Sequence, residues 1–260
     1  MRALIFDCDG VLADTERWGH WPAFNQMFKE FGVPIQWSED EYARKLKIGG
    51  GKERISSELT RDFVWTASLP TDADERALIV STWHKRKTEI FQQMVATGSI
   101  PPRPGVARII GEAREAGWKL GIASTSAEPS VAAILTVVLG PSWRSFIDVI
   151  LAGDCVARKK PAPDIYRAAL EQLHVGHKDA LAVEDSKSGL EAASGAELRC
   201  IITVNEYTKD EDFSEAVMVV SSLGEPEGEK TEVLSNRSQA SPGDYVTLSD
   251  LESCLDGPLV

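Results

Sequence analysis

Short apolar runs recur along the chain, and each run is followed by polar residues or glycine. The runs cover residues 3–6, 120–123, 149–152, 181–183 and 200–204. Continuous apolar runs of this length are typical of strands that are buried on both faces of a sheet. Apolar positions at helical spacing precede the last four runs, at residues 106–116, 129–139, 163–173 and 186–196. This alternation predicts an α/β fold with a parallel sheet flanked by helices.

Residues 15–99 break the alternation, because only helical spacing is present there. The expected helices cover residues 21–31, 38–47, 52–63 and 72–97, and Asp72 or Asp74 is the candidate N-cap of the last one. An all-helical segment directly after the first strand predicts a small cap domain, inserted into a core made of residues 1–14 and 100–260. The expected hinges are residues 14–17 and 98–104, and the second of these is rich in glycine and proline.

The last part of the chain has a different pattern again. Residues 217–222 are a candidate strand, and residues 246–255 are a candidate closing helix. Between them, residues 224–243 are rich in Glu, Gly, Ser and Pro and show no periodicity. Such a composition predicts a mobile excursion without regular structure.

Composition and charge limit the partners. The chain has 260 residues, of which 43% are hydrophobic and 26% are charged, and its net charge is −12. These values are typical of a soluble globular protein, and the negative charge argues against a nucleic-acid or membrane partner bound by bulk charge. An anionic substrate must therefore be bound by a local site. The four cysteines lack disulfide or metal-ligand spacing, and no targeting or membrane-spanning segment is visible, so we expect an intracellular protein.

Two aspartates follow the first predicted strand. Asp7 and Asp9 point the same way because strand residues alternate, and Gly10 permits a sharp turn after them. Ligands of parallel sheets bind beyond the carboxyl ends of the strands. Adjacent carboxylates repel, which favours a hard cation such as Mg²⁺ between them. One carboxylate can then attack phosphorus while the other transfers a proton. The alternative is a plain strand followed by an Asp-Gly turn.

Three further strand ends carry polar groups. Ser124 and Thr125 offer hydroxyl and N–H groups for a phosphoryl oxygen, although Ser126 beside them is also a candidate helix N-cap. Lys160, before a proline-rich turn, offers a point charge for phosphate, or else belongs to a solvated basic turn. Glu184 and Asp185 suit a Mg²⁺ site, or the N-terminus of the following helix. Four such signals, all at strand ends, favour a catalytic site.

As a set, these motifs resemble those of the haloacid-dehalogenase (HAD) superfamily over residues 3 to about 205. The resemblance implies a Rossmann-like core, with Asp7 as the nucleophile that forms an aspartyl-phosphate and Asp9 as the general acid/base. It further implies that Ser124 and Lys160 bind the phosphoryl group. It implies as well that Asp185 and Glu184 bind Mg²⁺ together with the Asp7 carboxylate and the backbone carbonyl of Asp9. An aspartate at position 9 favours the phosphatase and phosphomutase branch.

The helical segment resembles the cap of the CbbY-like subgroup, which includes sugar-bisphosphate phosphatases. Residues 49–54 contain Gly50, Gly51, Lys52 and Arg54, which can offer N–H groups and two cations to a distal phosphate. An ordinary helix start with exposed basic residues is the alternative. Relatives carry a histidine a fixed distance after the first motif. His20, a candidate substrate-binding residue of the cap or else a plain helix-start residue, lies one residue late, so the hinge contains an extra residue. Residues 85–87, all basic, are expected to form a solvated face.

The leading hypothesis is therefore a Mg²⁺-dependent phosphatase of a small sugar phosphate, with a bisphosphate such as xylulose 1,5-bisphosphate as the expected substrate. A sugar phosphomutase of the β-phosphoglucomutase type and a phosphoglycolate-type phosphatase are the alternatives. A non-catalytic binding protein on the same fold is disfavoured by the complete motif set. The expected partner is a small-molecule phosphorylated sugar, in the cytoplasm or the chloroplast stroma, and the oligomeric state is left open.

Overall fold

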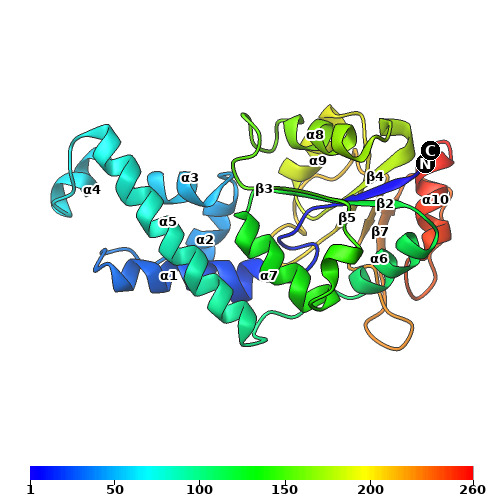
Figure 1. Ribbon diagram of the computed structural model, residues 1–260, viewed down its shortest axis with the longest axis horizontal. Coiled ribbons are helices and arrows are strands. Elements are labelled where there is room, and N and C mark those ends of the chain that lie inside the picture. The colour runs from blue at the N-terminus through cyan, green and yellow to red at the C-terminus, as the bar shows by residue number, and fades with distance from the viewer. Residues whose placement is uncertain (260) are drawn as a thin grey trace. The chain divides into compact units, whose positions relative to one another are not determined.

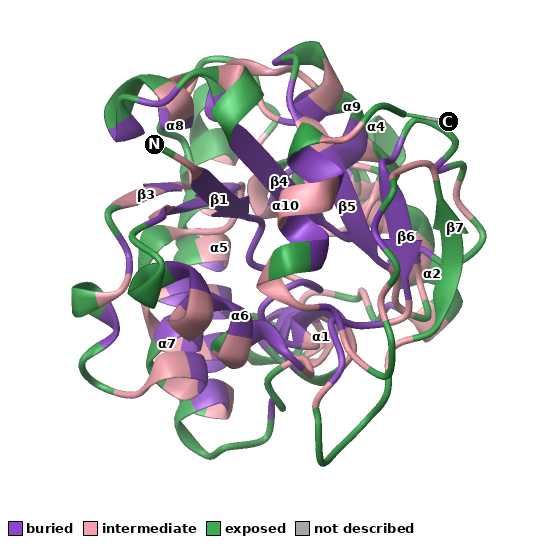
Figure 2. Cartoon of the chain, turned by 90° about the vertical axis from the view of Figure 1, so that its right-hand side faces the viewer, coloured by how far each residue is buried: buried purple, intermediate pink, exposed green. Residues whose placement is uncertain are grey.

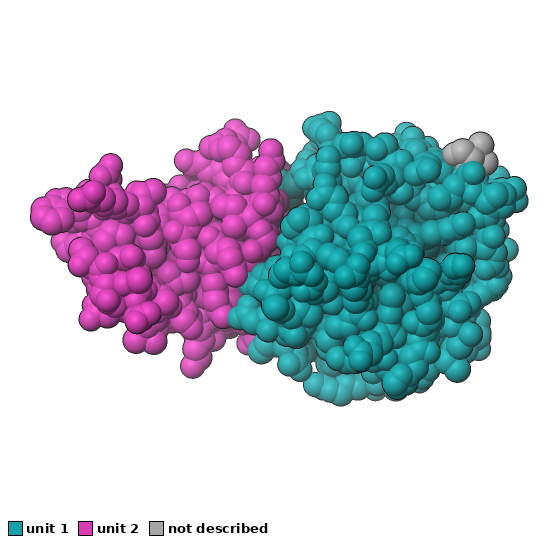
Figure 3. All heavy atoms as spheres, turned by 90° about the horizontal axis from the view of Figure 1, so that it is seen from above, with its two compact units in different colours: residues 1–14, 101–260 teal, residues 15–100 magenta. Residues whose placement is uncertain are grey.

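The computed structural model describes residues 1–259, and the chain divides into two compact units. The α/β unit comprises Met1–Asp14 and Pro101–Val260, and the helical unit comprises Thr15–Ile100 (Figure 3). The sequence predicted boundaries after residues 14 and 99, and the structure divides the chain after residues 14 and 100.

The α/β unit is built on a seven-stranded sheet with the order β3-β2-β1-β4-β5-β6-β7. The strands are β1 Ala3–Phe6, β2 Lys119–Ser124, β3 Val149–Ala152, β4 Ala180–Glu184, β5 Arg199–Thr203, β6 Met218–Val220 and β7 Val233–Asn236 (Figure 1). The first six strands are parallel, and β7 is antiparallel to β6. All four residues of β1 are buried, as its continuous apolar run predicts for a central strand. The predicted α/β class is therefore confirmed.

Helices cover both faces of this sheet. They are α6 Val106–Glu115, α7 Glu128–Leu139, α8 Asp164–Leu173, α9 Lys187–Gly195 and α10 Leu248–Asp256. The helices α8 and α9 lie on one face, and α6, α7 and α10 lie on the other (Figure 1). The connections from β1 to β3 cross one face of the sheet, and those from β3 to β5 cross the other. The order in which strands are added to the sheet therefore reverses between β1 and β4, although these two strands are parallel. Such a switch point leaves a crevice beyond the strand ends.

The expectation that residues 224–243 lack regular structure is wrong for β7. This strand pairs with β6 in the register Met218↔Asn236 and Val219↔Ser235. All four of its residues are exposed, whereas β6 is buried (Figure 2). Because neither face of β7 is buried, its sequence carries no hydrophobic alternation. The strand forms because it satisfies the outer backbone groups of β6.

The helical unit contains only helices among its described elements. They are the π-helical turn η1 Glu16–His20 and the helices α1 Trp21–Glu30, α2 Glu39–Leu46, α3 Gly51–Ser56, α4 Arg61–Thr66 and α5 Ala73–Ala96. The single helix expected at residues 52–63 is two helices, because Thr60 caps a new start by accepting from Phe63 N. Asp72, rather than Asp74, caps α5. No helix in residues 1–259 has the length and apolarity needed to cross a bilayer.

Aromatic packing stabilises the helical unit around Trp37. The Trp37 ring lies 5.0 Å from the rings of both Phe24 and Phe28, measured between centroids. Asn25 hydrogen-bonds both the N–H and the carbonyl of Trp37, at 2.8 Å each, and so holds the connection between α1 and α2. This tryptophan therefore packs in the core of the helical unit.

Arg108 on α6 is hydrogen-bonded to the backbone of the C-terminal part of the α/β unit. Its Nη2 donates to the carbonyl oxygens of Leu223, Gly224 and Val246, at 3.2, 2.9 and 2.9 Å. These carbonyls flank the long segment that contains β7. A single partly buried guanidinium therefore satisfies acceptors that would otherwise lose water without compensation.

Arg108→Met should lower the free energy of unfolding by about 2–3 kcal/mol, because the three carbonyls lose a charged donor. Arg114→Met is the matched control, since Arg114 lies on the same helix with 42% of its side chain exposed. The control should cost less than about 1 kcal/mol. Urea denaturation of both variants measures the difference, and equal effects would contradict a specific role of Arg108.

Candidate active site

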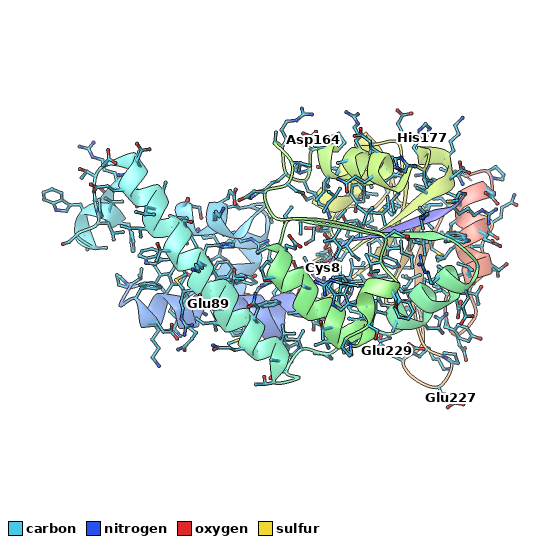
Figure 4. All side chains as sticks on the ribbon, in the orientation of Figure 1. Cys8, Glu89, Asp164, His177, Glu227 and Glu229 are labelled. Carbon is cyan, nitrogen blue, oxygen red and sulfur yellow. The ribbon has the colours of Figure 1, made fainter. Side chains whose placement is uncertain are left out.

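The predicted site residues of the α/β unit meet at the switch point of the sheet. Asp7 follows β1, Ser124 ends β2, Glu184 ends β4 and Asp185 comes next. Lys160 lies between β3 and α8. Cys8, labelled in Figure 4, marks the carboxyl end of β1, the central position in this group. The parallel order therefore brings together groups that are up to 178 positions apart in the chain, from Asp7 to Asp185.

A buried lysine links the carboxylates. Lys160 Nζ donates to Asp7 Oδ1 at 2.6 Å, to Glu184 Oε1 at 2.5 Å and to the carbonyl of Ala123 at 2.8 Å. Burial alone would lower the pKa of Lys160, but the carboxylates of Asp7 and Glu184 outweigh this effect and hold the pKa above its ordinary value. The ammonium group therefore stays charged. The alternative of a solvated basic turn is wrong for Lys160 and holds for Arg158, whose side chain is 68% exposed.

The buried acids outnumber this cation. Burial raises the pKa of Asp7 to about 8; Lys160 opposes the rise, while the carboxylates of Glu184 and Asp9 add to it. Asp185 is also buried and lies beside Asp7 and Glu184, so the group holds three buried carboxylates and one ammonium group. Negative charge in excess of this kind calls for a further cation.

The geometry of the carboxylates fits a divalent ion. One oxygen each from Asp7, Glu184 and Asp185 lies within 4.8 Å of the others. Among the described residues, Glu184 Oε2 is buried without a hydrogen-bond partner, so it has an acceptor site to offer. Hard oxygen ligands of this kind suit Mg²⁺. The side chain of Asp9 does not belong to this group of three.

The carboxylate of Asp9 is fixed separately. Ser126 Oγ donates a hydrogen bond to Asp9 Oδ2, and the backbone N–H of Ser126 donates to Ser124 Oγ at 3.1 Å. The interpretation of Ser126 as a helix N-cap is wrong, because α7 begins at Glu128 and the cap position is Ala127. Ser124 is buried and Thr125 is half-buried beside it.

Sequence reasoning missed two further side chains of the site. Asn205 Nδ2 donates to Asp185 Oδ2 at 2.7 Å, and Tyr166 O–H donates to Glu184 Oε1. Asn205 comes just after β5, so the rule that identified the other four strand ends would also have found it. Tyr166 occupies a buried position of α8, and no sequence signal separates it from an ordinary core tyrosine.

Two glycines permit this close packing. A Cβ at Gly10 would overlap Asp185 Oδ2, and Gly10 adopts a φ of 78°. A Cβ at Gly189, in the first turn of α9, would overlap the carboxylate of Glu184. Both positions therefore require a residue without a side chain.

In the helical unit, His20 is buried against Lys87. The His20 ring stacks on Phe91 at 4.1 Å between centroids, and its Nδ1 lies 2.6 Å from Lys87 Nζ. Lys87 is only 5% exposed, with its ammonium group 4.5 Å from the centroid of Phe24. The expectation of a solvated face is therefore wrong for Lys87, because this face of α5 packs against α1 and η1.

The extra hinge residue coincides with the π-helical turn η1, Glu16–His20. A π turn contains one more residue than the corresponding α turn, so it can accept an insertion without displacing the helix that follows. His20 consequently lies at the end of η1 as the N-cap residue of α1, and its side chain is buried in the helical unit. The turn explains how His20 occupies a defined place although its sequence position is one residue late.

The glycine-rich segment forms the start of α3. Gly50, with a φ of 99°, is the N-cap, Gly51 begins the helix, and Lys52 is half-buried. Arg54 Nε donates to the carbonyl of Ile48 at 3.0 Å. The alternative of an ordinary helix start with exposed basic residues is wrong for Arg54. Its side chain is 13% exposed and pairs with Glu16 at 3.7 Å.

Comparisons with known proteins identify the family. The model of the haloacid dehalogenase-like hydrolase family matches residues 1–197, and the chain belongs to this family. It is 44% identical over 228 residues to a CBBY-like protein of Arabidopsis thaliana, covering 88% of this chain and 71% of that protein. It is 43% identical over 225 residues to the protein CbbY of Cereibacter sphaeroides, covering 86% and 94%.

Solved structures extend the likeness. CbbY from Rhodobacter sphaeroides in complex with phosphate has a TM-score of 0.77 and 42% identity, over 85% of this chain and 95% of that one. The same values hold for an Asp-to-Asn variant of that CbbY in complex with xylulose 1,5-bisphosphate. The predicted resemblance to the CbbY-like group is confirmed, and the protein is a hydrolase of the phosphatase type.

Gly189→Ala should destabilise the protein by about 1–3 kcal/mol, because the new Cβ would press on a carboxylate that Lys160 and Tyr166 hold in place. Gly111→Ala is the control, since Gly111 lies within α6 with no atom within 4 Å of its added Cβ. The control should stabilise by up to about 1 kcal/mol through helix propensity. Thermal unfolding of the two variants should therefore shift in opposite directions, and a shift in the same direction would contradict the packing argument.

Proposed function

We propose that this chain is a Mg²⁺-dependent phosphatase that hydrolyses a small sugar bisphosphate, such as xylulose 1,5-bisphosphate, through an aspartyl-phosphate on Asp7. The observation that carries the proposal is the buried group of Asp7, Glu184 and Asp185 around Lys160. A buried group of three acids with one lysine is costly unless a ligand or a cation uses it. The complex of the CbbY relative with xylulose 1,5-bisphosphate supports the choice of substrate.

Asp7 is the proposed nucleophile. Lys160 binds its Oδ1 at 2.6 Å, which fixes the carboxylate and leaves Oδ2 to attack phosphorus. The new bond between Asp7 and phosphorus forms as the bond from phosphorus to the sugar oxygen breaks. Lys160, with Ser124 and Thr125, then stabilises the phosphoryl oxygens through a charge and through hydroxyl or N–H donors.

Asp9 is the proposed proton carrier. It protonates the departing sugar oxygen in the first step and takes a proton from the attacking water in the second, which releases inorganic phosphate and restores Asp7. The hydrogen bond from Ser126 holds one oxygen of Asp9 and orients the other. When bound by Asp7, Glu184 and Asp185, Mg²⁺ would neutralise charge on the phosphoryl group and on the nucleophile.

The helical unit is the proposed cap, and the start of α3 is the proposed site for the second phosphate. The backbone N–H groups after Gly50, together with Lys52, offer donors and positive charge for an anion. Arg54 is held by Ile48, Tyr42 and Glu16, so its guanidinium is oriented before any ligand binds. A net charge of −12 makes such local cations necessary for an anionic substrate.

Asp7→Asn should abolish Mg²⁺-dependent phosphate release, by about 10⁴-fold or more, because an amide cannot act as the nucleophile. The circular dichroism spectrum should remain that of the wild type, since the substitution keeps the shape of the side chain. Chelation of Mg²⁺ in the wild type should give the same loss, and restored Mg²⁺ should reverse it. Wild-type turnover in the variant would exclude Asp7 as the nucleophile.

Lys52→Ala should raise the KM for xylulose 1,5-bisphosphate by about 10-fold, the loss of about 1.4 kcal/mol of binding, while phosphoglycolate and hexose monophosphates change little. Lys85→Ala, at an exposed position of α5, serves as the control and should leave the KM unchanged. Parallel phosphate-release assays on these substrates measure the selectivity. Equal efficiency of the wild type on monophosphates, or an isomeric product without free phosphate, would contradict the proposal.

A further inference from the structure

Asp185 has a partner that lies outside the four motifs and outside the matched family segment. Asn205 follows β5, and its Nδ2 donates to Asp185 Oδ2 at 2.7 Å. The family model ends at residue 197. The contact therefore joins a fifth strand end to the group of buried carboxylates.

The orientation of the Asn205 amide is determined by its surroundings. Its Oδ1 accepts from the backbone N–H of Tyr207 at 2.9 Å. A backbone N–H can only donate, so the oxygen of the amide must face Tyr207 and the nitrogen must face Asp185. The backbone of Asn205 is fixed as well, because its N–H donates to Thr208 Oγ1 and its carbonyl accepts from Thr208 N, both at 3.1 Å.

Gly10 brings the first motif into the same contact. A Cβ on Gly10 would lie 2.8 Å from Asn205 Nδ2, and it would also overlap Asp185 Oδ2. Gly10 therefore packs directly against the hydrogen bond between Asn205 and Asp185. The residues that follow β1, β4 and β5 therefore pack together in one contact.

We propose that Asn205 is a positioning residue that occupies Oδ2 of Asp185 and directs Oδ1 toward Mg²⁺. Carboxylates that bind metals are commonly held by such outer hydrogen bonds. A neutral amide suits this role, since Lys or Arg in its place would neutralise Asp185 and weaken its attraction for a cation. The inference rests on the proposed function, because it assumes that Asp185 is a Mg²⁺ ligand.

Asn205→Ala should raise the dissociation constant for Mg²⁺ by about 10–100-fold, measured by isothermal titration of the protein with Mg²⁺ alone. Asn236→Ala is the matched control. Asn236 also uses one donor and one acceptor in its own turn, on Ala240 and Ser238, and it lies in β7 away from Asp185. The control should keep the wild-type dissociation constant, even where its thermal midpoint falls.

Asn205→Ser separates the turn from the contact with Asp185. A serine hydroxyl can still accept from the N–H two residues ahead, as in other turns of this kind, but it is too short to reach the carboxylate. The thermal midpoint without Mg²⁺ should therefore stay close to that of the wild type, while the dissociation constant for Mg²⁺ rises as in Asn205→Ala. Wild-type Mg²⁺ affinity in this folded variant would overturn the positioning role.

The two proposals fail in different ways. If the wild type itself binds no Mg²⁺ and releases no phosphate, then the proposed function is wrong, and the role of Asn205 fails with it. If the wild type binds Mg²⁺ and both Asn205 variants bind it equally well, only the role of Asn205 is wrong. A kcat/KM that falls in Asn205→Ser and recovers at saturating Mg²⁺ would support positioning over a structural effect.

Discussion

The Lys160 ammonium group, held between Asp7 and Glu184, is the interaction on which the site depends. Removing an ammonium and several carboxylates from water is costly, and attraction repays the cost only when the geometry is good. Here Lys160 has three acceptors between 2.5 and 2.8 Å, so all of its N–H groups are used. The same contacts leave the group with more acids than bases. The site is thus stable enough to fold and still has the charge to attract a cation.

The sheet makes this arrangement possible. The central strand β1 lies between β2 and β4, so Asp7, Ala123 and Glu184 at the ends of these strands all lie within hydrogen-bond distance of Lys160. Space is the second requirement, because each carboxylate must approach a neighbouring backbone closely. Gly10 and Gly189 meet it by having no Cβ where Asp185 and Glu184 lie. The strand order thus directs these side chains toward one another, and the two glycines leave space for the carboxylates.

The sequence allowed much of this to be predicted, because buried strands carry a continuous apolar signal and the chemistry follows each strand directly. The bounds of β1 and β3 agree with their apolar runs. The predictions that were wrong concern residues whose structure depends on tertiary contacts. The strand β7 has no buried face, so no apolar pattern indicates it. Serine is a common helix N-cap residue, but Ser126 donates its hydroxyl to Asp9 instead. Lys87 is a charged residue whose burial follows only from the packing of α5.

The two units treat buried charge in opposite ways. In the α/β unit, acids outnumber the single lysine. In the helical unit, Lys87 lies against aromatic rings and an imidazole, and Arg54 is oriented by a tyrosine and Glu16. Aromatic faces stabilise a cation without cancelling its charge, so Lys87 keeps more of its attraction for anions than a direct ion pair would leave. In a chain with a net charge of −12, an anionic substrate requires local cations of this kind. The proposed selectivity for a second phosphate thus depends on the packing that holds these cations, as much as on their charge.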